Sequence, residues 1–312
     1  MNKLLLALGV SALSPLALAK PVIVTSIKPV SMVVAAIAGD RAEIQQIVSS
    51  TASPHDFAMR PSDLKKIMKA DTVVWVGESL EGFLEKPLEN AGKEDSSIEW
   101  LALDGMALHN FAKEHHHGDA DEEDHDHDHD HDHEGHEGHH HVGVDPHVWL
   151  SPENVKVLAK AVTARLSSLD SANAKYYKDN LASFEKGLNA KDAEIRKALN
   201  KVNKVPYIVF HDGYSYFEQH YGLSHAGEIT VSPERKPGAK KVAEIRHEIE
   251  EHNVQCVFSE PQFSPAIVKA LLEGSDVKTA PLDPLGSDVK MGKNAYFSFL
   301  DSLSGQFLSC LG

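Results

Sequence analysis

Cysteine is nearly absent from this chain of 312 residues, which contains only Cys256 and Cys310. In an exported protein, an even pair of cysteines favours a disulfide over half of a metal site. Such a bridge would close a loop of about 53 residues, for which the chain-entropy estimate is roughly 4 kcal/mol. It would pin the C-terminus to a central strand.

Long hydrophobic runs are missing beyond the first residues, and no later stretch approaches the roughly 20 apolar residues of a membrane helix. The opening "MNKLLLALGVSALSPLALA" has a basic Lys3, an apolar run that starts at Leu4, and Ala17 and Ala19 in an A-x-A arrangement. These features predict a signal peptide at 1–19 that is cleaved before Lys20, and hence an exported mature chain. No cysteine stands at the cut, so lipid attachment and membrane insertion of the mature chain are not expected.

The chain also lacks a basic excess, because its formal net charge is −15. Residues 114–141 hold 12 acidic residues and no lysine or arginine, so most of this charge belongs to one segment. The remainder is nearly neutral, and nothing in it suggests the basic face that nucleic-acid binding requires. Hydrophobic residues make up 42% of the chain, enough for one or two packed cores.

Short apolar runs alternate with helical patterns along most of the chain, which predicts α/β units and a parallel sheet. Helices are expected at 61–70 and 82–90. Two more are expected to begin at 232–233 and 264–265, and a further helix to begin near 292. The expected strands are 22–27, 44–48, 72–76 and 98–101 in the first half, then 207–210, 224–229, 254–258 and 277–281.

Two helices interrupt this alternation in the middle of the chain. Ser151 is predicted to cap a helix that opens with Pro152 and reaches about Ser167. A second helix, from about Ser171 to Lys201, would span about 46 Å. Its apolar stripe consists of Tyr177, Leu181, Phe184, Leu188, Ile195 and Leu199. The expected organisation is a signal peptide at 1–19, an N-terminal lobe at 20–168 with an insert at 114–141, a linker helix at 169–203 and a C-terminal lobe at 204–312.

Three histidines occupy positions where ligands bind in such folds, close to the carboxyl ends of strands. His55 lies in the loop after the second strand, His147 lies just before a helix start, and His211 follows the first strand of the second lobe. Three neutral imidazoles with one oxygen donor suit tetrahedral Zn²⁺, whereas Mn²⁺ prefers more oxygen. The histidines therefore predict a zinc site between the lobes, although each one alone could be a surface residue.

Two acidic residues are candidates to complete this site. Asp283 follows the last strand and could supply the fourth donor, or it could open a turn because a proline follows it. Glu260 follows the strand that contains Cys256, and we expect it to support a ligand or to form the wall of the cleft.

The chain resembles the cluster A-I solute-binding proteins of zinc and manganese ABC importers over nearly its whole mature length. The resemblance rests on "SIKPV", "HDFAMRPSDLKKIMKADTVVWVG", the acidic His-rich insert, "HVWLSPE", "FHDGYSYFE", "CVFSEPQF" and "LDPLG". It implies two four-stranded α/β lobes bridged by a rigid helix, with the metal held between them. It also implies a periplasmic, monomeric protein that delivers zinc to a membrane permease with a cytoplasmic ATPase.

On matching positions, the family's metal ligands fall on His55, His147 and His211, and its disulfide falls on Cys256 and Cys310. A histidine at the third ligand position is characteristic of the zinc branch. One departure concerns the residue before the first ligand, where some zinc members have a glutamate and this chain has Pro54. Asp283 or a water molecule is therefore the expected fourth donor.

The insert at 114–141, called the His-rich insert below, has almost no apolar residues to bury, and its composition is typical of disorder. We expect an accessory metal-binding segment at the mouth of the cleft that concentrates or senses zinc, with an inert solvated segment as the alternative. Its candidate ligands are His115, His116, His117, His125, His127, His129, His131, His133, His136, His139, His140 and His141.

A zinc hydrolase or hydratase is the alternative function, because three histidines with one open position can also be catalytic. The segment "HEIEEH" at 247–252 resembles the zinc-protease motif, but its histidines are five residues apart and cannot face one metal from a helix. No further residue is placed as a general base. The sequence therefore favours a binding protein over an enzyme.

Overall fold

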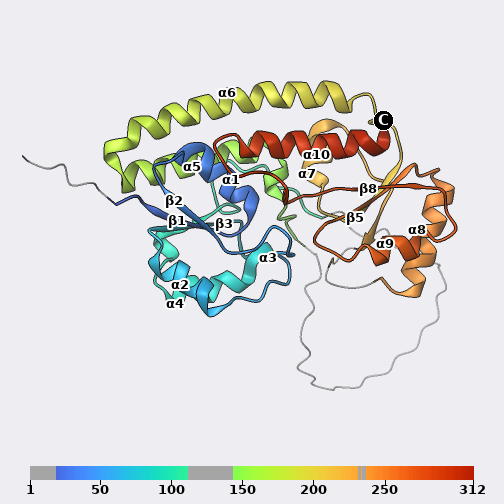
Figure 1. The fold of residues 1–312 in the computed structure, drawn as a ribbon, viewed down its shortest axis with the longest axis horizontal. Coiled ribbons are helices and arrows are strands. Elements are labelled where there is room, and N and C mark those ends of the chain that lie inside the picture. The colour runs from blue at the N-terminus through green and yellow to red at the C-terminus, as the bar shows by residue number, and fades with distance from the viewer. Residues whose placement is uncertain (1–18, 112–142, 231–232, 234–236) are drawn as a thin grey trace, which may run out of the picture.

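Two parallel sheets form the framework of the chain (Figure 1). The computed structural model describes residues 19–111, 143–230, 233 and 237–312. Each sheet has four strands, in the orders β2-β1-β3-β4 and β6-β5-β7-β8, so the two lobes repeat one topology. The predicted fold class of two α/β lobes joined by a long helix is confirmed.

In the described residues, the N-terminal lobe contains the first sheet and the α-helices α1 to α5. Its central strand β1 pairs with β2 and β3, so that Val24 lies between Gln45 and Val73. Apolar residues predominate in β1 and β3 because helices cover both faces of a parallel sheet. The strands are β1 (Val22–Thr25), β2 (Glu43–Gln46), β3 (Thr72–Trp75) and β4 (Ile98–Glu99). The helices are α1 (Lys28–Ala38), α2 (Pro61–Lys69), α3 (Glu78–Glu81), α4 (Glu85–Asn90) and α5 (Pro152–Leu169).

Helix α5 begins where the sequence predicts. The Ser151 side chain accepts a hydrogen bond from the main-chain N–H of Asn154, at 3.3 Å, and Pro152 follows it in the first turn. This cap satisfies one of the N–H groups that a helix start leaves without an intrahelical partner. It fixes the end of the segment that contains His147.

A long helix, α6 (Ala174–Leu199), runs along both lobes and lies beside the C-terminal helix α10 (Ala295–Leu311) (Figure 1). The expected start at Ser171 forms a short 3-10 turn before the α-helix begins. The Phe184 ring of α6 stacks on Phe297 of α10 at a centroid distance of 5.3 Å. Helix α6 also packs against α5 and α1, so its apolar stripe joins the lobes through packed side chains.

The C-terminal lobe contains the second sheet. Tyr207 and Val209 of its central strand belong to the core that extends under α6 and α10 from the other lobe, while Ile208 and Phe210 belong to a separate core on the opposite face. This alternation follows from the two-residue period of a strand. The strands are β5 (Tyr207–His211), β6 (Gly227–Thr230), β7 (Cys256–Ser259) and β8 (Lys278–Pro281). The remaining helices are α7 (Ser215–Tyr221), α8 (Ala239–Glu251) and α9 (Ala266–Leu271).

Cys256 of β7 and Cys310 of α10 form a disulfide, with their Cα atoms 6.0 Å apart. Both residues are buried. The bridge attaches the last turn of α10 to a central strand of the C-terminal lobe. Because α10 also packs against α1 and α6, the bridge links this sheet to the junction of the lobes.

Helix α8 begins at Ala239, with Gly238 as its N-cap. The helix start predicted at Ser232 lies outside the described residues. The expected helix at 82–90 is divided, into a 3-10 turn at Gly82–Leu84 and α4.

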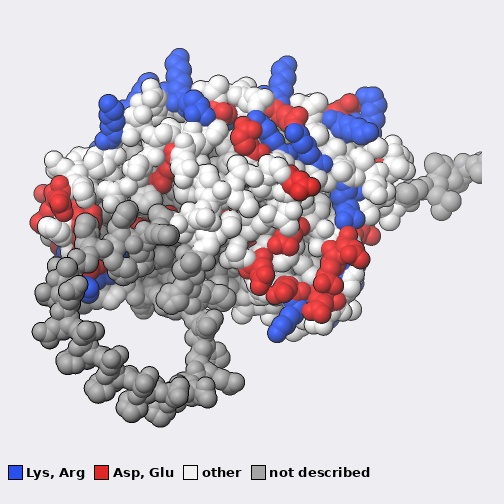
Figure 2. All heavy atoms as spheres, turned by 180° about the vertical axis from the view of Figure 1, so that it is seen from behind, with Lys and Arg blue, Asp and Glu red and all other residues white. Residues whose placement is uncertain are grey.

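Charges of both signs lie on the face of the molecule that Figure 2 shows. Lysine and arginine side chains project mainly along the upper edge, where Figure 1 places α6, and exposed residues of that helix include Lys175, Lys178 and Lys186. Within the described parts of the chain, no helix has both the length and the apolar character needed to span a bilayer.

Candidate metal centre

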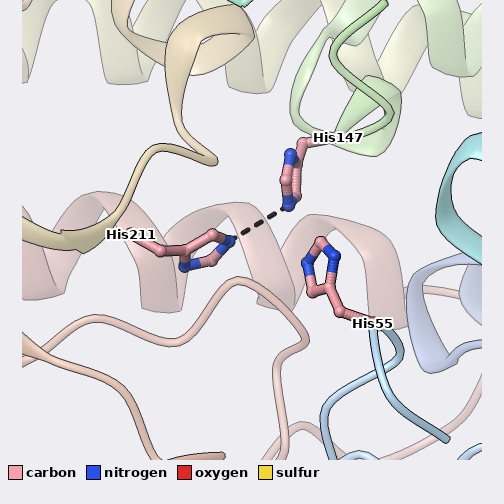
Figure 3. Close-up of side chains that lie close together, drawn as sticks. All are labelled: His55, His147 and His211. Atoms are coloured by element: carbon pink, nitrogen blue, oxygen red, sulfur yellow. Dashed lines mark hydrogen bonds between the residues drawn. The ribbon is translucent and has the colours of Figure 1, made fainter. Parts of the chain in front are cut away.

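Three histidines from distant parts of the chain converge between the lobes (Figure 3). His55 lies in the loop that connects β2 to α2, His147 directly precedes a 3-10 turn at Val148–Leu150, and His211 is the last residue of β5. Their potential ligand nitrogens lie within 4.8 Å of one another. Among the described residues, no other group of three or more His, Cys, Asp or Glu side chains is this close.

The spacing of the imidazoles fits a single ion. The Nε2 atoms of His147 and His211 lie 3.1 Å apart. Two nitrogens bound to one tetrahedral Zn²⁺ at about 2.0–2.1 Å would lie roughly 3.3 Å apart. The ring centroid of His55 lies 5.3 Å from that of His147 and 5.6 Å from that of His211. The three imidazoles therefore surround one common point.

His147 is oriented by a buried carboxylate. Asp145 Oδ1 lies 2.6 Å from Nδ1 of His147 and also accepts from its main-chain N–H at 3.0 Å. A carboxylate only accepts, so Nδ1 of the neutral imidazole carries the hydrogen and the lone pair is on Nε2. Ser215 of α7 donates to Asp145 Oδ2 at 2.5 Å. Burial raises the pKa of Asp145, but the contacts with His147 and Ser215 outweigh it and hold that pKa below its ordinary value.

His211 has the same arrangement on the other lobe. Glu260 Oε1 lies 2.6 Å from Nδ1 of His211, so the lone pair of the neutral ring is again on Nε2. Burial lowers the pKa of His211, but the adjacent charge and hydrogen bond of Glu260 outweigh it and raise the pKa above its ordinary value. His147 and His211 are 1% and 3% exposed, so both present Nε2 in an environment nearly closed to solvent.

The histidines line a pocket whose walls also include the apolar side chains of Trp149, Phe263 and Leu285. The Trp149 indole donates to the carbonyl of Pro284 at 2.7 Å, so one wall is itself a contact between the lobes. A cavity with apolar walls and few converging polar groups is the usual form of a small-ligand site.

Asp283 does not belong to the histidine cluster. Its Oδ1 accepts hydrogen bonds from Gln262 and from the main chain of Leu285, while Oδ2 accepts two from Ser287, through the main-chain N–H and the hydroxyl. The carboxylate is thus engaged in the turn after β8, which is the second of the two roles that the sequence left open. Glu260 lies behind His211 and is likewise outside the cluster.

Other sequence-derived candidates have different positions. The twelve histidines of the His-rich insert lie outside the described residues. In "HEIEEH", His247 lies on α8 and His252 directly follows the helix. They pair with Glu251 and Glu248 at 3.4 and 3.1 Å, as expected for a solvated helix face.

Asp145 and Gln262 were not singled out from the sequence. For Asp145, the available signal was its position two residues before a candidate ligand, as in "DPH". Gln262 had no comparable signal.

Two α/β lobes, a long connecting helix and a histidine cluster in the space between them define a metal-binding, two-lobed solute-binding protein. The model of the family described as "Zinc-uptake complex component A periplasmic", ZnuA, matches residues 23–310. The chain belongs to this family.

Individual relatives agree with this assignment. The chain is 39% identical over 311 residues to the high-affinity zinc uptake system protein ZnuA of Yersinia pestis, covering 100% of this chain and 98% of that protein. It is 40% identical over 290 residues to the ZnuA of Haemophilus ducreyi, covering 93% of each. A crystal structure of ZnuA superimposes with a TM-score of 0.75 at 25% identity, covering 94% of this chain and 100% of the other.

Proposed function

We propose that this protein captures Zn²⁺ between its lobes and delivers it to the membrane permease of an ABC importer that has a cytoplasmic ATPase. The observation that carries the proposal is the convergence of His55, His147 and His211 from both lobes. Zinc is the cargo in this scheme. The zinc-uptake family and the all-nitrogen character of the cluster both favour Zn²⁺ over Mn²⁺.

The ligand set in this proposal is the three histidines and one water molecule. Asp283 is the less favoured fourth donor because both of its oxygens are engaged in hydrogen bonds. Glu260 and Asp145 act on the metal through His211 and His147, since hydrogen bonds at Nδ1 orient a ligating imidazole and raise its basicity.

The proposed organisation keeps the boundaries derived from the sequence. Residues 1–19 direct export to the periplasm and are cleaved, 20–168 and 204–312 form the lobes, and 169–203 connect them. The mature chain works as a monomer without membrane insertion. The His-rich insert concentrates zinc near the cleft, because alternating histidines and acidic residues bind divalent metals weakly and at several places.

A binding role is favoured over catalysis by the two carboxylates beside the cluster. Asp145 and Glu260 both contact Nδ1 atoms of proposed ligands, so neither is positioned as a general base for a metal-bound water. Esterase and carbonic-anhydrase assays of the zinc-loaded protein test this choice. The proposal expects rates no higher than those of free zinc.

Titration with Zn²⁺ against a competing chelator tests the capture site. The unmodified protein is compared with a variant that replaces His55, His147 and His211 by alanine. We expect one tight site in the former and only weak binding in the latter. Equal tight binding by both proteins would refute the proposal.

A further inference from the structure

The side chain of Gln262 connects the two lobes next to the metal centre. It lies between β7 and α9 and lines the same cavity as the histidines. Its Nε2 donates to the main-chain carbonyl of Ser50 at 3.0 Å and to Asp283 Oδ1 at 2.9 Å. Both partners only accept, so the orientation of the amide group is determined by its surroundings.

On the C-terminal lobe, this amide is held by a fixed carboxylate. Asp283 receives four hydrogen bonds on its two oxygens, and its main-chain N–H donates to the Gln306 side chain of α10 at 2.8 Å. Asp283 is only 5% exposed. Gln262 is therefore attached to a rigid part of the lobe, through a residue that the sequence suggested as a metal ligand.

On the N-terminal lobe, the contact falls on the loop that contains His55. The loop leaves the sheet at Val48, whose N–H donates to Ser26 at 2.9 Å, and it turns at once, because Ala52 donates to the carbonyl of Ser49. The main-chain N–H of His55 then donates to the Ser53 hydroxyl at 3.2 Å. These local bonds link the position of His55 to the position of the Ser50 carbonyl.

The turn that Asp283 stabilises also contacts the N-terminal lobe elsewhere. The Lys28 ammonium group donates to the Ser287 carbonyl at 2.7 Å, and the Trp149 indole donates to the Pro284 carbonyl. Lys28 is only 8% exposed. The segment 283–287 is thus a junction of the lobes, and Gln262 extends this junction to the His55 loop.

We propose that Gln262 is a positioning residue for metal binding, which holds the His55 loop against Asp283 and thereby keeps His55 in register with His147 and His211. The inference rests on the proposed zinc site. Its action is indirect: the amide of Gln262 binds the loop, and the loop presents the ligand. Removal of the two N–H donors should let the loop move away from Asp283, so that the free protein has His55 in position less often and binds Zn²⁺ more weakly.

The test replaces Gln262 by methionine, which has a similar length but cannot donate a hydrogen bond. Loss of a residue that orients a metal ligand typically weakens metal binding about 10- to 100-fold, and we expect about tenfold for Gln262→Met. Zn²⁺ affinity is measured by chelator competition, and thermal unfolding of the metal-free proteins verifies the fold. Ser50→Ala is the matched control, because it retains the carbonyl that Gln262 contacts, and it should bind as the unmodified protein does.

A double-mutant cycle separates positioning of His55 from a general structural effect. In a His55→Ala background, Gln262→Met should cause no additional loss of Zn²⁺ affinity, because the ligand on which it acts is already gone. In a His211→Ala background, the additional loss should persist.

Two results would overturn the inference: unchanged affinity in Gln262→Met, or an equal loss in the His55→Ala background. Each leaves the proposed function standing if Zn²⁺ still requires the three histidines. If the triple histidine variant binds Zn²⁺ as tightly as the unmodified protein, the proposed function fails first, whatever Gln262 does.

Discussion

His147 and His211 present their Nε2 atoms to each other at 3.1 Å, although 64 positions separate them in the chain. Each ring has a buried carboxylate behind it, Asp145 in one lobe and Glu260 in the other. Two lone pairs at this distance repel each other unless a cation or a proton lies between them. The fold therefore brings together groups whose arrangement is stabilised by a positive ion.

Replacement of His211 by alanine should weaken Zn²⁺ binding far more than deletion of residues 115–141. The three histidines already lie close together, whereas a segment whose composition is typical of disorder loses about 1–2 kcal/mol of conformational entropy for each residue that binding fixes. For His211→Ala, we expect a loss beyond the roughly 10- to 100-fold typical of residues that only orient a ligand. Chelator competition measures both variants, and a larger loss from the deletion would contradict the cleft assignment.

Removal of the negative charge of Glu260 should weaken Zn²⁺ binding less than removal of the His211 side chain. Glu260→Gln retains an acceptor for Nδ1 of His211 but removes the negative charge that favours a cationic site. We expect Zn²⁺ affinity to fall about tenfold, at the lower end of the range for such partners. Glu250→Gln on the exposed face of α8 is the matched control and should leave the affinity unchanged. Equal affinities for both variants would mean that Glu260 does not act on the metal through His211.

The metal-free protein should become less stable at alkaline pH because of His225. Burial lowers the pKa of this histidine, but the adjacent Glu218 carboxylate, 2.8 Å from Nδ1, outweighs burial and raises it to about 9. A raised pKa in the folded state stabilises the fold fully below the unfolded value of about 6.5, and the stabilisation disappears as pH rises through about 9. The expected change in the free energy of unfolding is at most about 3 kcal/mol.

Urea unfolding of the metal-free protein at several pH values between 6 and 10 measures this effect. The unmodified protein should lose more stability across the range than His225→Gln does. His247→Gln serves as the control, because His247 is exposed on α8 and its side chain is 74% accessible. If the stability of His225→Gln and that of the unmodified protein change with pH in parallel, the pair of His225 and Glu218 does not contribute to stability as described.

The disulfide should contribute to stability more than to metal affinity. Cys256 and Cys310 are 54 positions apart, and closure of a loop of this length in the unfolded chain corresponds to roughly 4 kcal/mol. Replacement of both cysteines by serine should lower the free energy of unfolding by about this amount or somewhat less. Zn²⁺ affinity below the unfolding transition should change little, since neither cysteine lines the metal cavity. A large loss of affinity in the folded variant would contradict this separation of roles.

Much of the fold could be predicted because two signals in the sequence agree: the spacing of the apolar residues and the residue types that begin helices. The apolar stripe of α6 and the cap at Ser151 both appear where the residues predict them. Helix α1 was not identified from the sequence. All of its residues are buried, so its pattern is apolar on every side and lacks the helical period that a surface helix shows.

The histidine cluster was predictable where position alone marks a candidate ligand. His55 and His211 follow strands, and the carboxyl ends of parallel strands are where ligands bind. Asp283 also follows a strand, yet its carboxylate stabilises a turn, because the same residue type suits both roles. Gln262 could not be found from the sequence, since its partner is a main-chain carbonyl 212 positions away and any residue could supply it.

A crystal structure of the zinc-soaked protein, with anomalous scattering recorded at the zinc absorption edge, tests the central claim most directly. The account predicts one strongly occupied zinc ion bound by His55, His147 and His211, with a water molecule as the fourth donor. The tightest zinc found only at residues 115–141, with no ion among these three histidines, would contradict it.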